Sequence, residues 1–220
     1  MSKRVLVVLT ALIVVAAFAG GAFLYDRSGK GTEPAAAATV ANGTLVRPHS
    51  PVIGPPEAPV TIVEFFDPMC EACRAFYPIV KQIMADFPKD VRLVLRYTPF
   101  HKGADTAVRI LETARAQGRF EPVLEALMAT QPEWAAHGAP DLDKAWGYAK
   151  VAGLQVQRAQ SEAASPEITR VLEQDIADVK ANNVQQTPTF FVNGKPLTNF
   201  GPQQLRELVQ REVDQVRKGS

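Results

Sequence analysis

Two cysteines, Cys70 and Cys73, are the only ones in this 220-residue chain, and two residues separate them. They follow an apolar run, Ile62 to Phe66, that is typical of a buried strand, and they precede a segment with the spacing of an amphipathic helix. A cysteine pair at the start of a helix can close a disulfide, and the unpaired backbone N–H groups there lower the pKa of the first thiol. The spacing therefore predicts a redox pair, with Cys70 as the attacking thiolate and Cys73 as the more buried resolving thiol.

A structural disulfide and half of a zinc site are the other uses of such a pair. A disulfide that closes so short a loop restricts the unfolded chain very little and stabilises a fold weakly. A structural zinc needs four ligands, usually a second cysteine pair or a histidine pair nearby, whereas His49, His101 and His137 are scattered along the chain. The redox pair is therefore the favoured interpretation, with no metal and no cofactor expected.

The pattern around the cysteines predicts strands and helices in alternation. Residues 60–66 are β-branched and aromatic and lie between the turn signals Gly54-Pro55-Pro56 and Asp67-Pro68, which predicts a buried strand. A helix is expected from Cys70 to about Asp86, with Pro78 inside it, and a second strand over 91–97.

A long helical stretch is expected over about 104–182, interrupted at its glycines and prolines: Gly118, Pro132, Gly138-Ala139-Pro140, Gly153 and Ser165-Pro166. A third strand over 189–192 is followed by Asn193-Gly194, the strongest short signal for a hairpin, and by a fourth strand over 195–198. Pro202 opens a final amphipathic helix.

Two motifs give the chain a resemblance to a known family. The segment Phe-Phe-Asp-Pro-Met-Cys-Glu-Ala-Cys ends at Cys73, and Thr-Pro-Thr-Phe-Phe-Val-Asn-Gly runs from Thr187 to Gly194. Together they resemble the DsbA-like branch of the thioredoxin superfamily over about residues 52–217. The resemblance implies an α/β thioredoxin fold with a helical insertion between the second and third strands of the core. It also implies that Thr187–Pro188 is a cis peptide beside the cysteines, with backbone groups free to bind an extended substrate.

The resemblance also gives roles to two acidic residues. Glu64 lies six residues before Cys70, where the superfamily often has a buried carboxylate that helps to move the proton of the buried cysteine; the alternative is a strand-edge glutamate that faces water. Glu71, beside Cys70, stands where oxidants of the superfamily commonly have a basic residue such as histidine. A carboxylate there opposes thiolate formation, so we expect the disulfide to be less oxidising than in the strongest oxidants.

The N-terminal segment indicates export. Lys3 and Arg4 precede an uncharged apolar run, Val5 to Tyr25, that would form a helix about 31 Å long at 1.5 Å per residue, enough to cross a bilayer. We interpret residues 1–25 as a signal-anchor, because the run continues past the possible cleavage site Ala17-Phe18-Ala19; the alternative is a cleaved signal peptide. Residues 26–50 are predicted to be a flexible linker and 51–220 the folded domain.

These observations predict a thiol–disulfide oxidoreductase that acts on exported cysteine-containing proteins. Its catalytic domain is expected on the periplasmic or extracytoplasmic side of a bacterial cell envelope, anchored in the inner membrane, with a membrane redox partner. Thr187 also occurs in the isomerase and reductase branches, so the net direction stays open between oxidase and isomerase or reductase. A net charge of +1 and the absence of a Lys/Arg cluster exclude a nucleic-acid partner. The alternative function is a non-catalytic thiol-based chaperone or a copper-handling module on the same fold.

Overall fold

A computed structural model describes residues 42–219 of the chain. The expected signal-anchor, residues 1–25, lies outside the described residues, as does most of the expected linker. Between residues 42 and 219, none of the helices combines the length and the apolar character that a membrane crossing requires.

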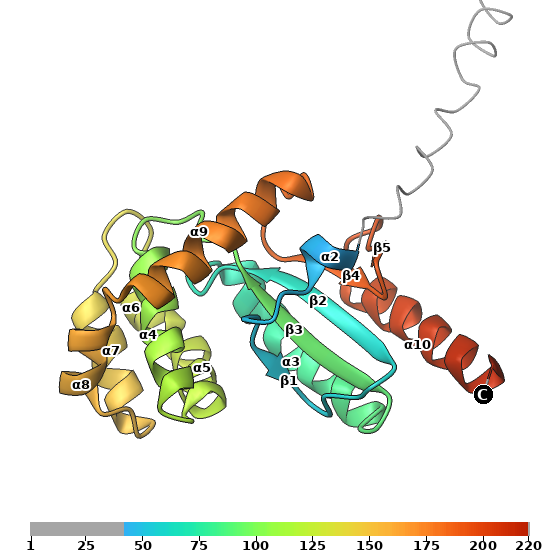
Figure 1. Cartoon of the computed structure of the whole chain (residues 1–220), viewed down its shortest axis with the longest axis horizontal. Coiled ribbons are helices and arrows are strands. Elements are labelled where there is room, and N and C mark those ends of the chain that lie inside the picture. Colours follow the sequence, from blue (N-terminus) through green and yellow to red (C-terminus); the bar gives the residue numbers. More distant parts are fainter. Residues whose placement is uncertain (1–41, 220) are drawn as a thin grey trace, which may run out of the picture. The chain divides into compact units, whose positions relative to one another are not determined.

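The described chain folds around a five-stranded mixed sheet with the order β1-β3-β2-β4-β5 (Figure 1). Strands β2 (Val60–Phe66) and β3 (Val91–Tyr97) are parallel, whereas β1 (Val52–Ile53), β4 (Thr189–Val192) and β5 (Lys195–Pro196) pair with their neighbours antiparallel. The strands expected over 60–66, 91–97 and 189–192 are confirmed at both ends, and β5 is shorter than expected. Parallel β2 and β3 are joined by helix α3 (Glu71–Asp86), as a parallel pair requires.

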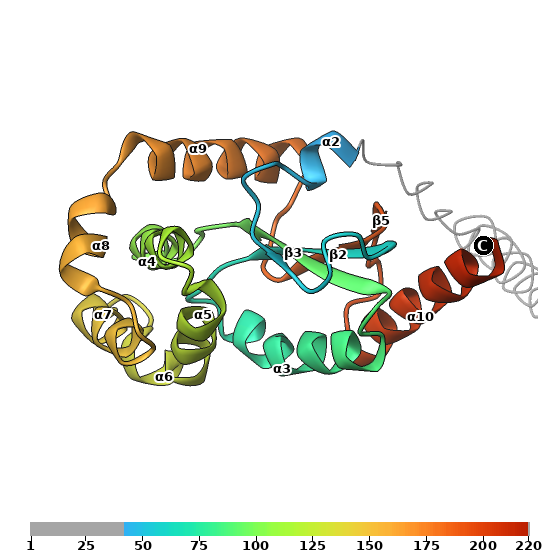
Figure 2. The same ribbon diagram turned by 60° about the horizontal axis from the view of Figure 1, so that its bottom comes forward.

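Helices cover both faces of this sheet. Figure 2 shows α3 and α10 (Pro202–Gly219) on one face and α9 (Pro166–Ala181) with the short α2 (Asn42–Leu45) on the other. Because successive strand residues point to opposite faces, Ile62 and Phe66 of β2 join the core under α3, whereas Val63 and Phe65 join a second core under α9. Glu64 shares the face of Ile62 and Phe66, so its carboxyl points toward the helix that carries the cysteines.

The helical insertion lies between β3 and β4, which confirms its predicted place between the second and third of the four predicted strands. It consists of α4 (Ala104–Ala116), α5 (Phe120–Ala129), α6 (Gln131–Trp134), α7 (Leu142–Val151), α8 (Val156–Glu162) and α9. The predicted breaks match the ends of these helices except at Pro132, which lies in the first turn of α6. Proline is tolerated there because the first N–H groups of a helix have no intrahelical partner.

The turn between β4 and β5 determines how these two strands pair. Asn193 and Gly194 have φ values of 47° and 80°, and Val192 pairs with Lys195 across the two-residue turn. Two successive positive φ values match the twist of a hairpin, and glycine adopts such a conformation without steric cost.

The segment before β1 belongs to the folded domain, contrary to the expectation of a linker that continues to residue 50. Leu45 is 1% exposed and packs in the core under α9. Arg47 binds Asp178 of α9 with two hydrogen bonds of 2.7 and 2.8 Å, and His49 Nε2 lies 2.8 Å from Asp175 Oδ1. The composition of this segment does not predict its place in the fold, because Leu45, Arg47 and His49 fix it to a helix that is distant in sequence.

Candidate active site

Cys70 lies at the junction of β2 and α3, as the sequence predicts. It is the N-cap residue of α3, with an extended backbone, and its carbonyl accepts the first hydrogen bond of the helix, from Arg74 N at 3.1 Å. The preceding turn is closed by two bonds to Asp67: Cys70 N donates to its carbonyl at 3.0 Å, and Met69 N donates to Oδ1 at 2.8 Å. The thiol therefore faces the unpaired N–H groups of the first helical turn.

Asp67 also connects this turn to the loop after β3. Its Oδ2 accepts hydrogen bonds from Phe100 N at 2.9 Å and His101 N at 3.0 Å, and it lies 2.7 Å from His101 Nδ1. A fully buried carboxylate with this many donors is a rigid support for the two loops that it joins. The sequence pattern predicts only a turn at Asp67. Its position directly after a buried strand is the one sequence feature that could indicate a role in the site.

The loop before β4 lies beside Cys70, because β4 is the neighbour of β2 in the sheet. The Thr187–Pro188 peptide is cis, which confirms the expectation from the family resemblance. Cys70 Sγ lies 3.2 Å from the carbonyl oxygen of Thr187, 117 positions later in the chain, and donates a hydrogen bond to it in its protonated form. Pro188 is buried and Thr187 is half-buried, and the contact of Thr187 with Sγ places these substrate-binding candidates beside Cys70.

The pKa of Cys70 is lowered to about 5, so the thiol is ionised at neutral pH. The largest cause is the hydrogen bond with the Cys73 thiol, followed among the favourable causes by the Thr187 side chain and by the backbone N–H groups of Cys73 and Ala72; burial acts in the opposite direction. Cys70 is thus a stabilised thiolate at a helix N-terminus, which is the state that attacks a disulfide.

Cys73 and Glu64 form the buried side of the site. Burial raises the pKa of the Cys73 thiol well above its usual range, and its hydrogen bond with Cys70 and the charge of Glu64 raise it further. Burial also raises the pKa of Glu64 to about 8, with the Cys70 thiolate as the second cause. Glu64 is 2% exposed, and among the described residues its Oε1 is the buried side-chain oxygen without a hydrogen-bond partner. These positions agree with the buried carboxylate expected and not with a strand-edge glutamate.

Glu71 lies beside Cys70 on the solvent side of the site. Its side chain is 69% exposed, and its carboxylate lies 3.5 Å from His137 Nε2, from the loop before α7. The pKa of Cys70 is strongly lowered in spite of this neighbour, because the hydrogen bonds to the sulfur outweigh a charge that water screens. The ring centroids of His137 and His101 are 5.6 Å apart. Two histidines that are distant in sequence therefore lie side by side, next to Glu71 and Asp67.

Gln131 is the second functional candidate that the sequence did not reveal. This side chain of α6 is 1% exposed, and its amide contacts the backbone of the turn that carries Cys70. A single glutamine inside a helical segment gives no sequence signal, because its importance depends on where the insertion folds back.

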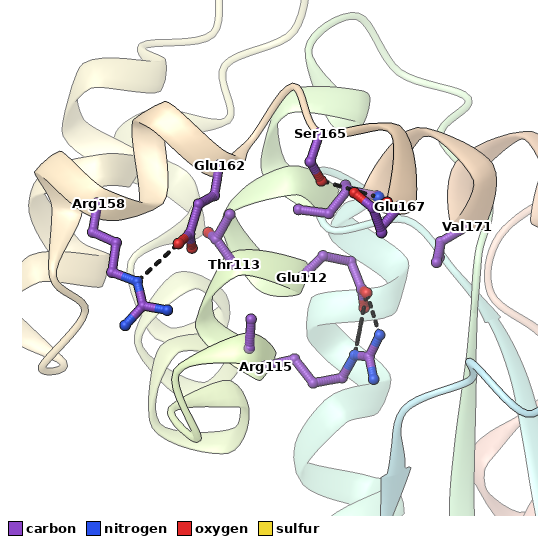
Figure 3. Close-up of a pocket in the computed structure, with 10 residues that line it drawn as sticks. Glu112, Thr113, Arg115, Arg158, Glu162, Ser165, Glu167 and Val171 are labelled. Carbon is purple, nitrogen blue, oxygen red and sulfur yellow. Dashed lines mark hydrogen bonds and ion pairs between the residues drawn. The ribbon is translucent and has the colours of Figure 1, made fainter.

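The insertion also encloses a charged pocket that is separate from the cysteines. It has a volume of about 420 Å³ and is lined by side chains of α4, α8 and α9 (Figure 3). Two ion pairs line it: Arg115 pairs with Glu112 at 2.6 Å and Arg158 pairs with Glu162 at 2.8 Å. Since neither the thiols nor the Thr187–Pro188 loop lines it, this pocket is not part of the candidate active site.

Comparison with known proteins agrees with this geometry. The family model described as thioredoxin matches residues 47–211, about three quarters of the chain. The chain belongs to the thioredoxin superfamily, in its DsbA-like branch. A thioredoxin-like oxidoreductase from Silicibacter pomeroyi superposes with a TM-score of 0.67 at 30% identity, covering 83% of this chain and 98% of that one. Oxidised BdbD from Bacillus subtilis gives a TM-score of 0.67 at 27% identity, covering 75% and 93%.

One curated relative is named as an ion antiporter and not as an oxidoreductase. The Na(+)/H(+) antiporter NhaA of Herminiimonas arsenicoxydans is 34% identical over 144 residues, which are 66% of this chain and 22% of that protein. The chain thus spans less than a quarter of the length of this relative. The similarity concerns a segment of about the size of the thioredoxin-fold domain. It is therefore no evidence that this chain transports ions.

Proposed function

We propose that this protein is a thiol–disulfide oxidoreductase of exported proteins. The observation that carries the proposal is the pairing of an ionised thiol, Cys70, with a buried protonated thiol, Cys73, one helical turn away and beside the Thr187–Pro188 loop. A thiolate at the start of the helix, here 7% exposed, and a fully buried protonated thiol are the two groups that disulfide exchange needs.

The exchange proceeds in two balanced steps. When the protein is reduced, the Cys70 thiolate attacks a substrate disulfide, a mixed disulfide forms, and one substrate sulfur leaves as a thiolate. In the mixed disulfide the charge of Cys70 is gone, which favours the ionised form of Glu64. Cys73 then gives its proton to the Glu64 carboxylate, the proposed acceptor, and attacks Cys70 Sγ. The second substrate sulfur is released, so the substrate gains two electrons and the protein becomes the disulfide. When the protein starts as the disulfide, the same two steps in reverse oxidise a substrate dithiol.

The lowered pKa of Cys70 supports net oxidation of substrates. A stabilised thiolate favours the reduced form of the protein, so the Cys70–Cys73 disulfide tends to accept electrons from substrate thiols. A membrane redox partner would then restore the disulfide, and Val5–Tyr25 would hold the chain in the inner membrane of the cell envelope. Retention of the full chain in membranes after a high-salt wash supports that anchor; a soluble mature chain that starts after Ala19 contradicts it.

Trapping of mixed disulfides tests the proposed activity. Cys73→Ala removes the resolving thiol, so disulfide-linked adducts of Cys70 with client proteins should accumulate and should disappear with dithiothreitol. Cys70→Ala is the matched control and should trap none, because Cys73 is buried and protonated. Preferential alkylation of Cys73 at neutral pH would reverse the assignment.

A thiol-based chaperone or a copper-handling module is the alternative on the same fold. Over residues 42–219, no cluster of three or more His, Cys, Asp or Glu side chains is arranged to hold a metal ion. Reduction of insulin by the wild type, and its loss in Cys70→Ala, supports the oxidoreductase. Tight binding of Cu(I) without insulin reduction supports the alternative.

A further inference from the structure

We infer that Gln131 is a positioning residue of the thiol–disulfide site, through which the helical insertion fixes the turn that carries Cys70 and aims its backbone N–H groups at the sulfur. The inference rests on the proposed function and extends it to a residue outside the two motifs. Gln131 lies 61 positions after Cys70, on the four-residue helix α6.

The contacts of Gln131 use both ends of its side-chain amide. Nε2 donates to the carbonyl of Pro68 at 2.9 Å and to the carbonyl of Cys70 at 3.0 Å. Oε1 accepts a hydrogen bond from Arg74 Nε at 3.1 Å, one turn into α3. This set of partners also determines the orientation of the amide, because a flipped amide would place its oxygen against two carbonyls and its N–H groups against a guanidinium.

The insertion holds Gln131 rigidly in this place. Trp134, on the same short helix, is fully buried, and its Nε1 donates to the carbonyl of Leu127 at 3.0 Å. Asp141 N donates to the carbonyl of Trp134 at 2.7 Å, which closes the loop after α6. The amide is therefore attached to a fixed support rather than to a mobile loop.

The two carbonyls that Gln131 binds belong to the peptides on either side of the Met69–Cys70 pair. Their orientation determines where the N–H groups of the first helical turn point, and those of Ala72 and Cys73 support the Cys70 thiolate. The donor pair of Gln131 also offsets the negative ends of two carbonyl dipoles close to the sulfur. Without it, two buried carbonyls lose a partner and the turn loses its restraint on one side.

The test compares Gln131→Met with the wild-type full chain. Gln131→Met keeps the volume of the side chain but removes both donors. We expect the pH midpoint of thiolate absorbance of Cys70 to rise, and the equilibrium constant for oxidation of glutathione to fall about tenfold, which is about 30 mV for a two-electron couple. Gln117→Met is the matched control, because Gln117 bridges two helices within the insertion through Gln155 and does not contact the cysteine turn.

A purely structural role would lower the thermal stability of Gln131→Met and leave both the thiolate midpoint and the equilibrium constant at wild-type values; that result overturns the inference. If Gln131→Met does not fold, Gln131→Asn keeps an uncharged amide that is too short to reach both carbonyls, and the same shift is expected. A wild type that fails to exchange with glutathione contradicts the proposed function, whereas the thiolate titration still tests the positioning role by itself.

Discussion

Glu64 shows how one position on a strand determines the chemistry of a side chain. Alternation along β2 turns Glu64 to the face that packs under α3, together with Ile62 and Phe66. Burial there disfavours the charged carboxylate and raises its pKa to about 8, so the group holds a proton at neutral pH and can exchange it near that pH. A proton acceptor for Cys73 must be ionised, and the loss of the Cys70 charge in the mixed disulfide favours the ionised form of Glu64, because that charge is the second cause of its raised pKa.

Glu64→Gln should therefore change the pH dependence of stability in a defined direction. The folded pKa of about 8 lies above the unfolded value, so the folded state binds the extra proton between these values and wild-type stability falls as the pH rises toward 8. The free energy of unfolding of the reduced wild type should fall, relative to Glu64→Gln, by on the order of 4 kcal/mol between pH 5 and pH 9. Urea unfolding of both proteins under reducing conditions measures this difference.

The lowered pKa of Cys70 acts in the opposite direction over the same range, but it cancels in the comparison to the extent that both proteins share it. Release of the mixed disulfide should also be slower in Glu64→Gln, because the acceptor for the Cys73 proton is lost. Two results together would contradict this account of Glu64: free energies of unfolding that change equally with pH in both proteins, and an unchanged rate of mixed-disulfide release. They would show that Glu64 has neither a raised pKa nor a role in accepting the Cys73 proton.

Elements with local signals could be predicted, and elements fixed by distant contacts could not. The strand over 60–66, the helix after Cys70 and the Asn193-Gly194 hairpin each carry their own pattern, and all three are confirmed. Helix α2 and strand β1 have four and two residues, too few for periodicity to show. Of the site, the cysteines and the Thr187–Pro188 loop were found through their motifs. Gln131 and His137 were not, because the insertion brings them to the site only after it folds.

The N-terminal segment is held by a buried ion network that reaches from β3 to α9. Arg96 is fully buried; it binds Asp175 at 2.7 Å and Asp178 at 2.6 Å, and its Nη1 donates to the carbonyls of Thr44 and Leu45 at 2.6 and 2.8 Å. One guanidinium thus joins a strand, a helix and the segment before β1. Removing one partner of a buried network leaves the other charges unpaired, which is the costly case.

Arg96→Met should lower the free energy of unfolding by about 3–5 kcal/mol at pH 7, whereas Arg47→Met, at a side chain that is 30% exposed, should cost about 1 kcal/mol. Burial acts to raise the pKa of Asp178, but hydrogen bonds from Arg47 and Arg96 outweigh it and lower the pKa. The contribution of Arg47 should therefore be lost as the pH falls through this lowered pKa. Urea titrations at pH 7 and at a series of pH values below 3.8 test both statements. Equal stabilities of wild type and Arg96→Met would exclude a structural role for the network.

At the scale of the whole molecule, the sheet, the N-terminus of α3 and the loop before β4 together determine the surroundings of the two thiols. The sheet supplies the buried carboxylate, the N-terminus of α3 supplies N–H donors, and the loop supplies Thr187. A Cys70 pKa of about 5 lies between the values of about 7 in thioredoxin and about 3.5 in the strong oxidant DsbA. Since a more acidic thiol stabilises the reduced form, the couple should also lie between these two proteins in potential.

The reduction potential of the Cys70–Cys73 couple should thus fall between about −270 mV and about −120 mV. Glu71→Gln removes a negative charge near the thiolate and should raise the potential, but by less than about 30 mV, because Glu71 is exposed and faces His137. Equilibration of both proteins with glutathione buffers of known ratio measures both quantities. A wild-type potential at the DsbA value would mean that Glu71 does not weaken the oxidant, and a potential at the thioredoxin value would mean that the thiolate contacts of Cys70 are offset in the disulfide form. A lower potential in Glu71→Gln would contradict this electrostatic effect of the Glu71 charge and would point to its contact with His137 instead.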